Sequence, residues 1–169
     1  MKQVYVLLVI LLLSQACNEK KPISSVDPVN WDKRTVGYAM GDSFTSGTTY
    51  LSAYSQIYGQ TESLTHDLTV TVSMRNTSPD DTVFVKRAAY YNTGGHLIRT
   101  YFDRTIYIAP METVEIVIDE VDQDGGTGAN FLFDWQTGSG STEPLFEAVM
   151  ISTSGQQGLS FTTQGTRIM

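Results

Sequence analysis

From about residue 47 onward, apolar and polar residues alternate in short runs, a pattern typical of strands that bury one face. The clearest run is HDLTVTVSMR, at positions 66–75. Its apolar residues would share the inner face: Leu68, Val70, Val72 and Met74. The following Asn-Thr-Ser-Pro predicts a turn, so the segment is interpreted as a half-buried antiparallel strand.

Further alternating runs follow, separated by turn residues. TVFVKRAAYYNTGGHLIRTY predicts a hairpin that turns over Asn92–Gly95, and RTIYIAPMETVEIVIDE predicts two strands that bend at Pro110. ANFLFDWQ, PLFEAVMIST and GLSFTTQG add three more β-rich runs. After residue 17 we find no amphipathic helix with capping residues.

About eight short strands with frequent turn signals predict an all-β fold. We expect an antiparallel β-sandwich, immunoglobulin-like or similar, of about 7–9 strands. The chain of 169 residues is long enough for one domain with a sizeable core, which we place at residues 47–169.

The N-terminal residues predict where in the cell the protein is located. A lysine precedes an apolar run from Val4 to Leu13, and small and polar residues follow, which is typical of a secretory signal peptide over residues 1–16. A membrane-spanning helix needs about 20 apolar residues, so this ten-residue run is too short for one.

The single cysteine, Cys17, stands at the expected cleavage point, and this arrangement resembles the lipobox of bacterial lipoproteins. Ser14 occupies the position where that motif usually has leucine. The resemblance implies that Cys17 is acylated and anchors the protein to a membrane, with residues 17–46 as a flexible tether. It also implies a location in the cell envelope. Because Asn18, instead of the aspartate associated with inner-membrane retention, follows the cysteine, we expect the outer membrane, with the domain facing the periplasm or the cell surface.

The net charge of the chain limits the classes of partner that it is expected to bind. The formal net charge is −7 and the pI about 4.6, which disfavours nucleic acid because nucleic-acid binding uses a basic face to neutralise phosphates. An envelope protein or a glycan is the expected partner. Tyr50, Tyr54 and Tyr58 recur at a spacing of four, which would place them on one face of a strand, either in the core or as rings that stack on sugars.

The stretch DEVDQDGGTGAN carries the residues most suited to a cation or ligand loop: Asp119, Asp122, Asp124 and Asn130. Calcium takes six to eight oxygen ligands, yet the spacing here misses the EF-hand pattern. The alternative is a turn in which Gly125, Gly126 and Gly128 supply positive φ angles. Calcium is the one cofactor that the sequence leaves open, and no other metal is indicated.

Catalytic motifs are not evident. No G-x-S-x-G sequence occurs, and His66 and His96 lack the spacing of zinc ligands. One enzymatic alternative remains, a periplasmic enzyme acting on glycan or peptidoglycan, in which Asp122 or Asp124 would face Glu147 across a pocket.

Four blocks together resemble the bacterial domain of unknown function 3124: YSQIY, LTVTVSMRNTSPDDTVFVKRAAYYNTGGHLIRTYFD, IAPMETVEIVIDEVDQDGGTGANFLFDW and EPLFEAVMISTSGQQGLSFTTQG. The resemblance spans about residues 48–165 and is most specific at Gly125–Phe131 and Glu147–Phe161. It implies a secreted or lipid-anchored envelope protein and assigns no catalytic residue.

Together these features predict a lipid-anchored envelope protein that acts as a binding or structural module. The two alternatives are the glycan-directed enzyme and a calcium-stabilised, adhesion-like module.

Overall fold

The structure, a computed structural model, describes residues 29–37, 43–153 and 158–169. The predicted signal peptide and Cys17 lie outside these residues. Within them the chain forms eleven strands and two short 3-10 helices, and none of its helices is long and apolar enough to cross a membrane. The elements are η1 (Asp32–Arg34), β1 (Phe44–Ser52), β2 (Gln56–Tyr58), β3 (Thr65–Asp67), β4 (Thr69–Arg75), β5 (Val83–Tyr91), β6 (Leu97–Ile108), β7 (Thr113–Ile118), η2 (Gly126–Gly128), β8 (Asn130–Gly138), β9 (Leu145–Ser152), β10 (Leu159–Gln164) and β11 (Thr166–Arg167).

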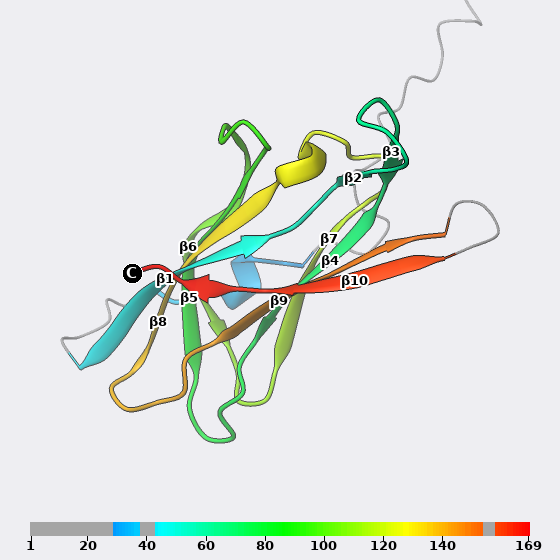
Figure 1. The fold of residues 1–169 in the computed structure, drawn as a ribbon. Helices are drawn as coiled ribbons and strands as arrows, with labels where there is room; N and C mark the ends of the chain where they lie inside the picture. The colour runs from blue at the N-terminus through cyan, green and yellow to red at the C-terminus, as the bar shows by residue number, and fades with distance from the viewer. Residues whose placement is uncertain (1–28, 38–42, 154–157) are drawn as a thin grey trace, which may run out of the picture.

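Two antiparallel sheets form the body of the molecule, which confirms the predicted all-β sandwich class (Figure 1). One sheet has the order β11-β1-β8-β5-β6 and the other β10-β9-β4-β7. A separate two-stranded hairpin, β2-β3, extends from one end. The chain passes from β10 to β11 through Gly165, so its last strands join the edges of both sheets.

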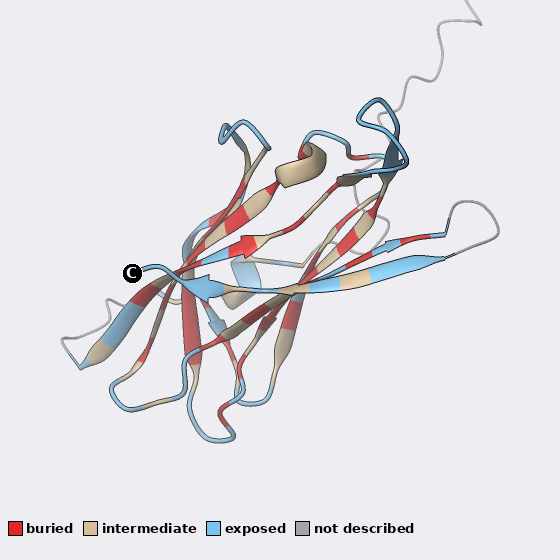
Figure 2. Cartoon of the chain, in the orientation of Figure 1, coloured by how far each residue is buried: buried red, intermediate tan, exposed pale blue. Residues whose placement is uncertain are grey.

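The core lies between the two sheets and follows the period-two pattern of the sequence (Figure 2). In β4 the predicted inner residues Val70, Val72 and Met74 are fully buried, and β8 alternates strictly between buried and half-buried positions. Three aromatic rings stack in succession across the interface, from Phe131 to Phe133 to Phe146. The hydrophobic alternation is therefore sufficient to explain which face of each of these strands is buried.

The described parts of the range expected to be tether, residues 29–37 and 43–46, include elements that contact the rest of the domain. Strand β1 already begins at Phe44. Upstream, Trp31 packs on Phe102 with ring centroids 4.7 Å apart, and Thr35 forms a β-bridge with Ile106. These residues pack against β6 because Trp31 supplies a large apolar surface that the sequence pattern alone does not assign to a strand.

The three tyrosines spaced by four do not share a strand, contrary to the expectation. Tyr50 lies in β1 and Tyr58 in β2, while Tyr54 lies in the irregular link between them, where β1 ends at Ser52. Tyr54 packs beside Phe161 of β10, with ring centroids 6.0 Å apart, and Tyr58 is 60% exposed. The break in β1 resets the alternation, so spacing does not carry across it.

Candidate functional site

Three connections meet at one end of the sandwich, which we call the loop end (Figure 1). They are the connection formed by the β2–β3 hairpin, the β5–β6 turn at residues 92–96, and the β7–β8 connection at residues 119–129. Hydrogen bonds tie the last of these to both of the others, through Thr93 and through Asp67. The β7–β8 connection, which contains the predicted cation or ligand loop, therefore lies at the centre of the loop end.

Asp122 of the predicted cation loop is buried inside the protein and paired. Its side chain is 2% exposed, and its Oδ2 accepts a hydrogen bond from Nη2 of Arg99 at 3.0 Å. Arg99 also donates from Nη1 to the hydroxyl of Tyr101 at 3.0 Å. A buried carboxylate is stable only with such a partner, so Asp122 fixes the loop onto β6.

Beneath the loop, Tyr90 and Ser55 form a buried hydroxyl pair 2.6 Å apart. Burial raises the pKa of Tyr90 to about 12, so the phenol is neutral over the physiological range. A Cβ at Gly125 would collide with the Tyr90 hydroxyl and lie 2.6 Å from the Ser55 hydroxyl oxygen. Gly125 is therefore required for close approach of the loop to this pair.

The predicted glycine turn is correct at one of its three positions. Gly126 has φ of 70°, whereas Gly125 has φ of −68°, and Gly128 is not among the residues with positive φ. Thr93 holds the turn from the neighbouring loop: its hydroxyl donates to the carbonyl of Gly125 and accepts from the N–H of Gly128 at 2.8 Å. Gly125 and Gly128 therefore do not serve to provide a positive φ. Glycine fits at these positions because a side chain would crowd Tyr90 and Ser55 at Gly125 and Thr93 at Gly128.

Of the other predicted loop residues, Asp124 contacts Asp122 through its backbone N–H, which donates to Oδ1 at 3.4 Å. Asp119 accepts the N–H of Val121 within its own turn, Asp124 is exposed, and Asn130 is the first residue of β8, opposite Ser52 and Tyr91. Among the described residues, no group of three or more His, Cys, Asp or Glu side chains is placed to hold a metal ion.

The carboxylates of the enzymatic alternative belong to different ion pairs. Glu147 on β9 binds Arg75 on the outer face of the four-stranded sheet, with Nε and Oε2 2.9 Å apart. Asp122 binds Arg99 at the loop end. The structure gives no support to a catalytic pair between them.

A groove opens at the loop end between β3 and the β7–β8 connection, with a volume of about 450 Å³. We call it the loop-end groove; it is lined by Thr65, His66, Asp67, Glu120, Val121 and Gln123. Asp67 links its two walls, because its Oδ1 accepts from Gln56 at 2.7 Å and its Oδ2 from Gln123 at 2.8 Å. A carboxylate has about four acceptor positions, so Asp67 retains capacity to bind a ligand.

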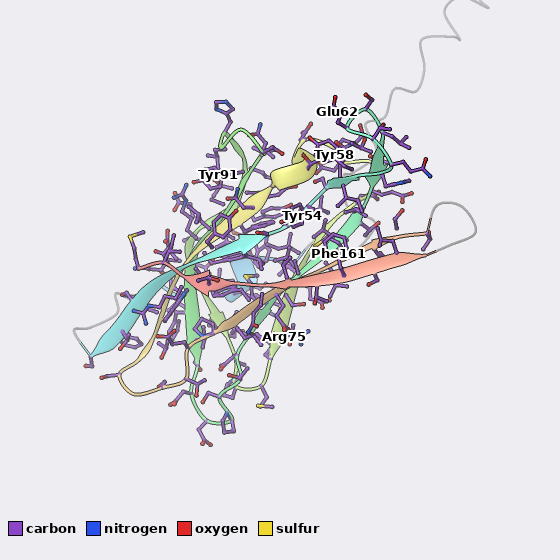
Figure 3. All side chains as sticks on the ribbon, in the orientation of Figure 1. Tyr54, Tyr58, Glu62, Arg75, Tyr91 and Phe161 are labelled. Carbon is purple, nitrogen blue, oxygen red and sulfur yellow. The ribbon has the colours of Figure 1, made fainter. Side chains whose placement is uncertain are left out.

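An exposed aromatic ring lies next to this groove. Tyr58 pairs with Thr65 across the β2–β3 hairpin, so Tyr58 and the groove-lining Thr65 are direct cross-strand neighbours on one face. Figure 3 places Tyr58 and Glu62 together on this hairpin, at the extremity of the molecule. Across the groove, Val121 is 74% exposed. Carboxylate, amide, imidazole and hydroxyl groups thus surround a hollow flanked by a ring, an arrangement suited to hydrogen bonding and stacking with a polar ligand.

The sequence did not point to Asp67, Gln56 or Gln123 as site residues. They are separated by up to 67 positions and meet only because the hairpin folds beside the β7–β8 connection. The one signal available was the density of polar residues around Asp122, in the same connection as Gln123.

Comparison with known proteins identifies a family and no activity. The model of the family described as "Protein of unknown function (DUF3124)" matches residues 46–168. Among curated proteins, none matches the chain in sequence. A solved structure described as "Crystal Structure of Thermotoga maritima 1070" is 12% identical with a TM-score of 0.46, covering 71% of this chain and 92% of that chain.

Proposed function

The chain belongs to the DUF3124 family of proteins of unknown function, and from that membership and the loop-end geometry we propose a binding role. The protein is a lipid-anchored component of the bacterial cell envelope. Acylated Cys17 holds it to the outer membrane, and its domain binds a glycan in the loop-end groove. The observation that carries the proposal is the chain of hydrogen bonds from Gln56 through Asp67 to Gln123, which fixes the groove beside the exposed ring of Tyr58.

The chemistry of the groove favours a sugar. Sugars present many hydroxyl groups, which carboxylates and amides bind directionally, and their rings present C–H faces that stack on tyrosine. Asp67 and Glu120 supply acceptors, Gln123 supplies an amide, and Tyr58 supplies the ring. The net charge of −7 is consistent with a partner other than nucleic acid.

Binding to a peptidoglycan disaccharide tests the proposal. The full chain, solubilised in detergent, should bind the N-acetylglucosamine–N-acetylmuramic acid unit in isothermal titration calorimetry. Replacing Tyr58 by Ala should weaken binding at least about tenfold, which corresponds to about 1.4 kcal/mol, because the stacking surface is lost. Glu120→Gln should also weaken it, because a charged acceptor becomes neutral.

Two matched substitutions serve as controls. Tyr50→Ala removes a tyrosine that is also partly exposed but lies in β1, and Glu62→Gln changes a carboxylate outside the groove lining on the β2–β3 hairpin. Both should leave the affinity unchanged. Glycan binding that Tyr58→Ala and Glu120→Gln leave intact would place the ligand elsewhere, and no binding of the disaccharide would refute the proposed ligand.

A further inference from the structure

A β-bulge in β5 places two consecutive cationic residues on one face of the five-stranded sheet. Pairing with β8 passes from Val85–Trp135 directly to Arg87–Asp134, so Lys86 is an extra residue on β5. Strict alternation would send Lys86 and Arg87 to opposite faces. The extra residue resets the alternation, so Arg87 joins Lys86 on the outer face and Ala88 returns to the core.

Two carboxylates flank these cations in register. Arg87 lies opposite Asp134 on β8 and opposite Asp103 on β6. Asp134 also accepts a hydrogen bond from the hydroxyl of Thr48 at 2.7 Å. These side chains line a second hollow of about 290 Å³, which we call the bulge pocket. Its lining residues are Ser46, Gly47, Thr48, Lys86, Arg87, Asp103, Asp134 and Met169.

The charges of the bulge pocket are not paired with one another. Five of the six arginines, all of which the structure describes, form an ion pair within 4.0 Å, and Arg87 is the exception within the described residues. Its Nη2 donates only to the hydroxyl of Tyr91, at 3.3 Å. Lys86, Asp103 and Asp134 likewise form no ion pair among the described residues.

We propose that the bulge pocket binds a small zwitterion, a ligand with an ammonium group and an anionic group a few ångströms apart. Lys86 and Arg87 bind the anionic group, and Asp103 and Asp134 bind the ammonium group. Two cations and two carboxylates give the pocket no net side-chain charge, so a ligand with both charges satisfies all four groups, whereas a simple ion satisfies two. The same chemistry occurs in a peptide with free ends and in a phosphoethanolamine headgroup.

Calorimetric titration of the full chain in detergent tests this assignment, with alanylalanine and O-phosphoethanolamine as the probes. We expect at least one probe to bind, and the tighter one identifies the source of the ligand. N-acetylated alanylalanine keeps only the negative charge and alanylalanine amide only the positive one. Each should bind at least about tenfold more weakly than alanylalanine if the peptide is the ligand, because two groups of the pocket stay unsatisfied.

Two conservative substitutions locate the site. Lys86→Gln and Asp103→Asn should each weaken binding about tenfold or more, while Lys33→Gln and Asp80→Asn, which change charges outside the pocket, should not. Circular dichroism confirms that each variant is folded. Absence of binding by both zwitterions, or equal binding to the pocket variants and the wild type, would overturn the proposal.

The bulge pocket and the loop-end groove are distinguishable. Their lining residues do not overlap, so Tyr58→Ala should leave zwitterion binding unchanged, and Lys86→Gln should leave glycan binding unchanged. Either proposal can therefore fail without the other.

Discussion

At the scale of single residues, the loop end depends on contacts that leave no room for a side chain at particular positions. Gly126 combines two restrictions, because its φ of 70° lies in the left-handed region and a Cβ there would lie 2.8 Å from the hydroxyl oxygen of Thr93. That hydroxyl also accepts the N–H of Gly128, so moving it breaks a bond of the turn. A substitution at Gly126 would therefore disturb both the backbone conformation of the turn and the hydrogen bonds by which Thr93 holds the β7–β8 connection.

Replacing Gly126 by Ala should lower the free energy of unfolding by about 1–2 kcal/mol, the cost of a left-handed conformation for a residue with a Cβ. The measurement is chemical denaturation followed by circular dichroism. Gly37→Ala is the control, because nothing lies within 4 Å of its Cβ and its φ is not in the left-handed region. An equal effect of the two substitutions would mean that the turn does not need this conformation.

At the scale of elements, a bidentate ion pair helps to hold the segment before β1, in addition to the Arg104–Asp32 pair. Arg34 donates to both carboxylate oxygens of Glu112, at 2.6 and 3.1 Å, and Glu112 also accepts the N–H of Ala109. Together with the Trp31–Phe102 contact, this pair fastens η1 to β6 and to the β6–β7 turn. The hydrogen bonds from Arg34 lower the pKa of Glu112 below its usual value of 4.5.

This shift predicts a pH dependence of stability with a defined sign. A carboxyl group whose pKa is lowered on folding stabilises the protein above its unfolded pKa and loses that contribution as the pH falls through the folded pKa. Wild-type protein should therefore exceed Glu112→Gln in stability by a constant amount above about pH 5, and the gap should narrow toward about pH 3. Denaturation curves across this range measure it.

Glu62→Gln provides the baseline for this experiment, because Glu62 is exposed at the β2–β3 tip and forms no ion pair among the described residues. Its stability should follow the wild type at every pH. A gap between wild type and Glu112→Gln that stays constant down to the lowest pH would show that the ion pair contributes nothing to folding.

The sequence predicted the buried faces of regular strands well, but it could not predict features that depend on breaks in a strand or on pairing between strands. Alternation identified the buried face of β4, because the pleat alone decides which side chains point inward. Alternation could not place Tyr54, since the chain leaves the sheet between β1 and β2. It also could not reveal the bulge at Lys86, which is defined by pairing with β8, or the Arg99–Asp122 pair, whose members are 23 positions apart.

At the scale of the whole molecule, the two proposed sites occupy different parts of one two-sheet scaffold. The loop-end groove is formed mainly by connections, whose side chains do not have to pack in the core. The bulge pocket lies on the outer face of the five-stranded sheet. The intervening core holds both in place because its aromatic rings pack across the two sheets.

Retention is predicted to depend on Cys17. A net charge of −7 gives no general attraction to anionic lipid, and stable attachment takes more than one acyl chain, as a lipoprotein cysteine provides. Wild-type protein should incorporate labelled fatty acid and sediment with membranes, whereas Cys17→Ala should incorporate none and appear in the soluble fraction after cleavage or release. Ser24→Ala, within the same expected tether, should behave as wild type. A mature wild-type protein with an unmodified Cys17 in its mass spectrum would refute the anchor, while both binding proposals would stand, because they rest on residues of the folded domain.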